Sequence, residues 1–309
     1  MKKSILYFAI AACVAVCAVS CGSDDEVATP PAPEQLPLPV YSAQAATYSL
    51  ADSAVVSSNG AVLKSMNFTE SGKAIFEISV NGKTKYVSYD MVIADGKYTI
   101  KDKDREIGMV QDLTSRTSSN TTVNLTITII IDGVSYVFST SDPVSAVRTA
   151  NEMAGSDNLN NIARTWTVQS MFLELEGDVS LSKLENSGNL EVFLDEALKR
   201  NVKLDENEKA QLKRTVNGFI VDKNGNFIIE YTEHKDGSTY AEVASWTWNG
   251  NKTDELSFKF RNSEYGNKFL SDNSTIKVEF NAAGGCTFSL STDVSGSQKY
   301  KANLIVVLK

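Results

Sequence analysis

Few side chains in this chain have the types and spacing that catalysis requires. His234 is the single histidine, and it lies in a run, 233–237, whose residues are typical of a hairpin turn. One histidine excludes a His-rich zinc site and makes a nucleophilic triad depend on this position alone. No G-x-S-x-G, H-E-x-x-H or phosphate-loop pattern occurs. We therefore expect a solvated turn residue here, no metal site and no cofactor.

Three carboxylates alternate along one segment, at Glu174, Glu176 and Asp178. Two carboxylates that flank a sugar linkage could act as acid and base in glycoside hydrolysis. The same alternation, with apolar residues between, also fits a strand that has one solvated face. We expect no enzyme activity and no catalytic residue, and a hydrolase that uses Glu174 or Glu176 is the alternative.

Two tryptophans, Trp246 and Trp248, are two residues apart and share one face of an expected strand, with Tyr240 aligned further back. Aromatic rings on one face can stack on sugars or line an apolar cavity. The same rings can equally fill a protein core. These three residues are the predicted ligand-binding site, and the choice between ligand and core stays open.

The N-terminus has the parts of an export signal. Lys2 and Lys3 precede the apolar run 5–19, and small residues lead to Cys21. The run is shorter than the ~20 residues of a bilayer-spanning helix, although an uncut membrane anchor is the alternative. Residues 1–20 are therefore predicted to be a cleaved signal peptide.

The residues around the predicted cut resemble the lipobox of bacterial lipoproteins. Ala18 and Ser20 precede Cys21, although Leu is usual where Ala18 stands. The resemblance implies a lipid on the Cys21 thiol and hence a membrane partner. The acidic run 23–26 resembles the tag of surface-exposed Bacteroidetes lipoproteins, which implies an outer-membrane protein at the cell surface. A plain acidic spacer is the alternative.

Length and charge set further bounds. At ~150 residues per domain, 309 residues suggest two domains. A net charge of −8 repels phosphate backbones, so nucleic acid is not an expected partner. Cys286 is the single cysteine beyond residue 21, and we expect a buried core residue there, with a reactive thiol as the alternative.

Turn signals and hydrophobic periodicity predict an all-β protein with a small helical insert, built as two antiparallel β-barrel or sandwich domains in tandem. Residues 123–131 alternate with period two, and Asn-Gly at 81–82 predicts a hairpin. Asp142 before a proline predicts a helix that runs to 154. The predicted divisions are a signal peptide 1–20, an acidic and Pro-rich tether 21–41, an N-terminal β domain 42–141, a helical linker 142–161 and a C-terminal β domain 162–309 with a helical insert 187–215.

The insert begins with an amphipathic stripe at Leu190, Phe193 and Leu194. Such a stripe can close the mouth of a barrel, cover a sheet edge or bind a partner.

The second β segment resembles lipocalin-like (calycin-like) barrels. Thr165 and Trp166 open it, and a meander with glycine turns follows Val216. That family has glycine two residues before the tryptophan, where this chain has Arg164. The resemblance implies a non-catalytic surface lipoprotein that binds a small apolar or sugar-like ligand or a protein partner. A glycan-binding accessory protein of a polysaccharide uptake system is the alternative.

Overall fold

The computed structural model describes residues 46–51, 54–112, 120–149, 157–202, 204–261, 275–294 and 298–309. The predicted signal peptide 1–20, the lipid-attachment residue Cys21 and the tether 21–41 lie outside these residues. The described part forms eighteen strands and three helices, and every strand pairing is antiparallel. The predicted all-β class is confirmed.

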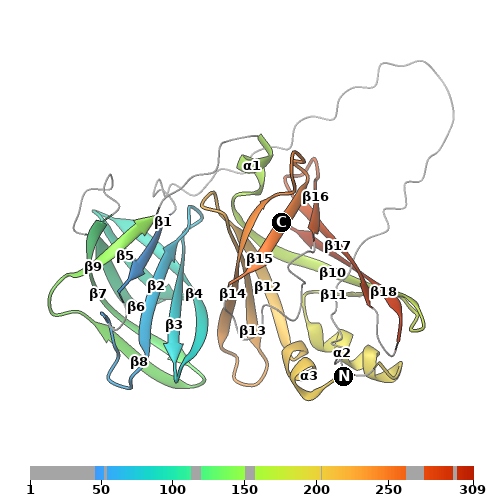
Figure 1. The fold of residues 1–309 in the computed structure, drawn as a ribbon, viewed down its shortest axis with the longest axis horizontal. Coiled ribbons are helices and arrows are strands. Elements are labelled where there is room, and N and C mark those ends of the chain that lie inside the picture. The colour runs from blue at the N-terminus through green and yellow to red at the C-terminus, as the bar shows by residue number, and fades with distance from the viewer. Residues whose placement is uncertain are drawn as a thin grey trace, which may run out of the picture.

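The described residues between 46 and 149, called here the first half, form nine strands (Figure 1). They are β1 (Ala46–Leu50), β2 (Val62–Phe68), β3 (Lys73–Val80), β4 (Lys83–Ala94), β5 (Lys97–Asp102), β6 (Arg105–Asp112), β7 (Asn120–Ile131), β8 (Val134–Ser139) and β9 (Val144–Thr149). β1 pairs with β2 and with β9, and β9 pairs with the first residues of β7, so the path of pairings returns to its start. Asn81 and Gly82 have φ of 51° and 79°, as the hairpin prediction requires.

The helix predicted after Asp142 is wrong. Val144–Thr149 is strand β9, and its buried residues alternate with period two at Ala146 and Arg148. The apolar residues of this segment would also fit one face of a helix. In the folded chain, however, the backbone of β9 pairs with that of β1 and of β7. The helix of the predicted linker 142–161 is the short α1 (Asp157–Ile162).

The described residues between 157 and 309, called here the second half, hold α1, nine further strands and two further helices (Figure 1). They are β10 (Thr165–Gly177), β11 (Leu181–Asn186), α2 (Leu190–Lys199), α3 (Glu206–Leu212), β12 (Arg214–Val221), β13 (Asn226–Glu233), β14 (Thr239–Trp248), β15 (Glu255–Phe260), β16 (Thr275–Phe280), β17 (Cys286–Val294) and β18 (Tyr300–Leu308). The helices α2 and α3 lie within the segment 187–215, where a helical insert was predicted.

Strand β10 brings the two ends of the second half together. Its first residues pair with β12, and the rest pairs with β18 and β11. From β12 to β18, each strand pairs with the next one, so this path of pairings also returns to β10. Gly218 permits the close approach of β10 and β12, because a Cβ there would lie 2.3 Å from the Trp166 carbonyl oxygen.

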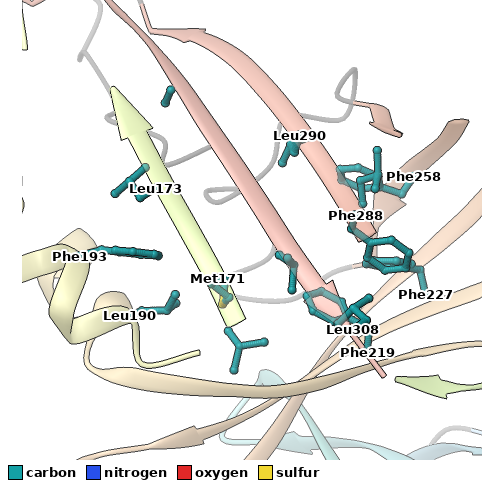
Figure 2. Packing of buried hydrophobic residues seen from close by; sticks show 14 of the residues in the cluster. Met171, Leu173, Leu190, Phe193, Phe219, Phe227, Phe258, Phe288, Leu290 and Leu308 are labelled. Carbon is teal, nitrogen blue, oxygen red and sulfur yellow. The ribbon is translucent and has the colours of Figure 1, made fainter. Parts of the chain in front are cut away.

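Each half has its own large apolar core. The second-half core contains Phe219, Phe227 and Phe288, whose ring centroids lie 5.5 to 6.0 Å apart. Figure 2 shows Leu190 and Phe193 of α2 extending toward β10 in the same core. Burial of these rings is the main source of stability expected for this half.

The two halves also touch. Strands β4 and β14 pair at Tyr86 and Ala241, and β3 and β4 lie beside β13 and β14 in Figure 1. A third, smaller apolar cluster spans the contact, with members from both halves: Ile75, Tyr86, Ile220, Ile228, Ala241 and Val243. Ser88 Oγ donates a hydrogen bond of 2.5 Å to Glu230 Oε1 across it. The halves are therefore joined by buried apolar and polar contacts.

Candidate functional site

The predicted aromatic site does not form one face. Trp246 is 2% exposed, and its indole Nε1 donates a 3.1 Å hydrogen bond to the Asp222 carbonyl oxygen. Trp248 is partly buried and meets the Trp246 ring edge-on, with centroids 5.3 Å apart. Both rings pack into the second-half core, so Trp246 offers almost no surface on which an outside sugar could stack.

Tyr240 lies elsewhere, although it is on the same strand. Its ring packs with the first-half core and with Tyr231, at a centroid distance of 6.1 Å. Its hydroxyl accepts a hydrogen bond of 2.9 Å from the Asp132 backbone N–H and lies 3.2 Å from the Asp132 carboxylate. The structure thus brings Trp246 and Trp248 together and places Tyr240 at the contact between the halves.

Glu174 and Glu176 lie on the outer side of β10, and Asp178 follows the end of the strand. Met171, Leu173 and Leu175, between and before them, are buried. Glu174 accepts a hydrogen bond from the Asn303 side chain, and Asp178 accepts one from the Lys299 N–H. This is the arrangement of a strand with one solvated face, and it gives no enclosed acid and base pair.

His234 lies in the turn between β13 and β14, as expected from its neighbours. Its Nδ1 is 2.8 Å from Glu191 Oε2, and its Nε2 is 2.9 Å from Thr215 Oγ1. The ring therefore ties this turn to the start of α2. A hydroxyl at Nε2 and a carboxylate at Nδ1 flank the ring in the order of a nucleophilic triad, but all three side chains are partly exposed and the hydroxyl is that of a threonine within β12.

Cys286 is fully buried and forms no disulfide within the described residues. Burial raises the pKa of the Cys286 thiol, and the Arg164 guanidinium opposes this only in part. A thiol with a raised pKa is a poor nucleophile, because the thiolate is the reactive form.

The second half holds an interior cavity of about 90 Å³ that is partly open. One water needs roughly 10–15 Å³ by the same measure, so the cavity has room for several waters or a small organic molecule. Its walls are nearly all apolar and come from β10, β12, β13, β14, β16, β17, β18 and both insert helices; the apolar lining residues include Met171, Leu190, Phe193, Leu212, Val216, Phe219, Ile229, Ile276, Leu290 and Val306.

One ion pair interrupts this apolar wall. Arg214 Nη1 lies 2.9 Å from Glu242 Oε1, and both side chains are 5% exposed. The guanidinium also donates to the Gln211 carbonyl oxygen and stands 4.3 Å from the Tyr231 ring centroid. Removing one member would leave a buried charge, which is strongly destabilising. The pair is thus the one charged feature among the residues described as lining the cavity.

No family model matches this chain, and no curated protein matches it.

The insert helices form one wall of the cavity. Asn189 caps α2, because its side chain accepts a 3.0 Å hydrogen bond from the Glu191 N–H. This cap sets the direction of the helix, and Leu190 and Phe193 then point toward β10 (Figure 2). Of the three interpretations of the apolar stripe, the structure favours the one in which the helix closes an end of the β interior.

No described helix has the length and hydropathy to cross a bilayer. Within the described residues, no three His, Cys, Asp or Glu side chains gather as metal ligands would.

Arg214 and Glu242 were missed by the sequence analysis, yet a signal was present. Glu242 occupies the same face of β14 as Ala244 and Trp246, so a charge stands at a position where the pattern calls for an apolar residue. A charge on a buried face needs a partner. Its partner, Arg214, is on a strand that follows the helical insert, and spacing alone does not identify it.

Proposed function

We propose that this chain is a non-catalytic, lipid-anchored protein of the outer cell surface, whose second half binds a small ligand with an apolar body and one polar group. The observation that carries the ligand proposal is the apolar cavity with the Arg214–Glu242 pair in its wall. Small-molecule sites are mostly apolar pockets in which a few polar groups fix orientation.

The two closed paths of strand pairing support a description of the halves as tandem lipocalin-like barrels. In that description, the paths β1–β9 and β10–β18 each enclose one of the two apolar cores. The interior of the second body is mostly filled, so we expect a ligand about the size of one aromatic ring.

Binding is tested with toluene, benzoate and benzylamine, which share one ring and differ in charge. We expect saturable binding of at least one of them in ligand-observed NMR. The order of affinity among the neutral, anionic and cationic probes should show whether Arg214 or Glu242 contacts the polar group of the ligand. Leu290→Phe adds volume to the cavity wall and should weaken binding by about tenfold or more. Ile130→Phe, on an exposed face of β7, is the matched control and should bind as the unaltered chain does.

The ligand proposal would be contradicted if none of the three probes bound, or if Leu290→Phe bound them as tightly as the unaltered protein does. The control for folding is cooperative denaturant unfolding of Leu290→Phe, because overpacking costs typically 1–3 kcal/mol.

The anchor is tested by mass spectrometry of the chain from its native membrane. We expect an N-terminus at Cys21 with a diacylglyceryl thioether and an acylated amine, and several acyl chains hold a protein firmly because each buried CH₂ adds about 0.8 kcal/mol. Cys21→Ala should abolish the lipid mass. An unmodified N-terminus at Met1 would reject the anchor without bearing on the cavity.

A further inference from the structure

A second hollow lies outside the interior cavity, at the contact between the halves. It has a volume of about 930 Å³ and is lined from the first half by the β3–β4 and β7–β8 hairpins and from the second half by α3 and the β13–β14 hairpin. In Figure 1 these hairpin ends and α3 point to the same end of the molecule. We call it the lysine cleft, after its four lysines: Lys83, Lys85, Lys213 and Lys235.

The charge of the lysine cleft is opposite in sign to that of the chain. The four lysines face two carboxylates, those of Asp132 and Glu233, whereas the whole chain has a net charge of −8. Charges of one sign in a cleft with low-dielectric walls focus the field and raise the local concentration of counter-ions. Among the described residues, neither Lys213 nor Lys235 forms an ion pair.

Contacts behind the lysines hold the walls in place. The Lys85 ammonium stands 5.7 Å from the Tyr240 ring, and that tyrosine is hydrogen-bonded to Asp132 across the contact between the halves. The His234 backbone N–H donates a 3.0 Å hydrogen bond to the Lys213 carbonyl oxygen, which fixes the β13–β14 turn against the end of α3. A wall that is already ordered costs less conformational entropy when a ligand binds.

We propose that the lysine cleft binds a small polyanion, a molecule with several carboxylate, sulfate or phosphate groups. The volume approaches the upper end of the range for drug-sized ligands, roughly 300–1,000 Å³, so it suits an oligomeric anion better than a single inorganic ion. Lysines supply point charges on long stems, which suits anionic groups of varied geometry. This site is separate from the interior cavity, and its test does not depend on the proposed function.

Three anions of different chemistry identify the group that is bound: trigalacturonate for carboxylate, a heparin-derived hexasaccharide for sulfate and tripolyphosphate for phosphate. Binding to the full chain is measured by calorimetry, with maltohexaose as the neutral comparison. We expect at least one anion to bind, maltohexaose not to bind, and a rise from about 20 to about 200 mM NaCl to weaken binding several-fold, because screening is strong over that range.

The variant Lys213→Gln with Lys235→Gln should weaken that binding by about tenfold or more, since two cationic contacts with the anion are lost. Lys97→Gln with Lys103→Gln removes the same charge from the β5–β6 region and should leave binding unchanged. Equal losses in both double variants, binding of maltohexaose as tight as that of the anions, or no binding by any anion would overturn the proposal.

Retention of toluene, benzoate or benzylamine binding by Lys213→Gln with Lys235→Gln confirms that the two sites are distinct. Loss of both kinds of ligand in this variant would overturn the separate lysine cleft.

Discussion

At the scale of single residues, burial decides which chemistry is open to this chain. Trp246 and Cys286 are both types that act at surfaces or active sites in other proteins, yet both lie within the second-half core. Arg214 and Glu242, by contrast, are charged and nearly as buried. The buried charges, and not the aromatic or thiol groups, are therefore the residues that we connect with a ligand.

Trp246→Ala should lower the free energy of unfolding by about 3–5 kcal/mol, the usual cost of removing a large buried ring. The substitution also leaves the Asp222 carbonyl oxygen without its indole donor. Trp248→Ala, at a partly buried ring on the same face, should cost only about 1 kcal/mol. Denaturant unfolding followed by far-UV circular dichroism measures both. Similar losses in the two variants would contradict the core role of Trp246.

The Cys286 thiol should not react with a disulfide reagent such as dithionitrobenzoate while the protein is folded. It is fully buried, and burial raises its pKa above the ordinary range for a thiol. Reaction should begin only with global unfolding in denaturant. The variant Cys286→Ser is the control, because the signal that comes from the Cys286 thiol should be missing from it. Rapid reaction at neutral pH without denaturant would show that the thiol is accessible.

At the scale of elements, the contact between the halves depends on a few polar groups in an apolar setting. Glu230 on β13 accepts the Ser88 hydrogen bond and lies 3.3 Å from the Lys73 ammonium. Burial alone would lower the pKa of Lys73, but the carboxylates of Glu230 and Asp90 raise it overall. The lysine therefore stays charged, and its partners set how β3 and β4 meet β13.

Glu230→Ala should lower the free energy of unfolding by about 2–3 kcal/mol, because the buried Ser88 hydroxyl loses its acceptor and Lys73 loses one of two carboxylates. Glu230→Gln keeps an acceptor and should cost about 1 kcal/mol. The exposed Glu106→Ala is the control and should stay within about 0.5 kcal/mol of the unaltered chain. Equal stability of Glu230→Ala and Glu106→Ala would show that this contact contributes nothing.

At the scale of the whole molecule, two large cores are joined by a third, smaller cluster and by one strand pairing. Tyr231 and Tyr240 belong to the second half in sequence but pack with the first-half core. The sequence predicted two β domains in tandem, and the structure has two large cores with a shared contact. We expect the halves to influence each other's stability.

The protein should lose stability as pH rises above 10, the ordinary tyrosine pKa. Burial raises the pKa of Tyr86 and Tyr240 at the contact, and it raises the pKa of Tyr89 to about 12. The phenolate is thus disfavoured in the folded chain. This contribution to stability is complete below pH 10 and is lost as pH rises through the raised pKa values.

Unfolding free energies measured between about pH 9 and pH 12, together with phenolate absorbance, test this. Tyr86→Phe should flatten the decline, since it removes one of the three groups. Titration of all tyrosines near pH 10 in the folded protein, with no change in stability, would contradict the prediction.

Local patterns were enough for much of the fold. Period-two alternation in 123–131 became β7, the Asn-Gly turn became the β3–β4 hairpin, and the apolar stripe from Leu190 became α2. These elements depend on neighbours within a few residues, and their own chemistry specifies them. The tandem barrels, the lipid anchor and the ligand remain proposals.

The sequence by itself determined the all-β class, the hairpin turns, the helical insert and the shortage of catalytic groups. Tertiary structure decided that 144–149 is a strand, that Trp246 faces a core, that Arg214 finds Glu242, and that four lysines from both halves line one cleft. The physical reason is that burial, ion pairing and strand pairing depend on partners far away in the chain. Their positions in space are fixed only when the strands have found their neighbours.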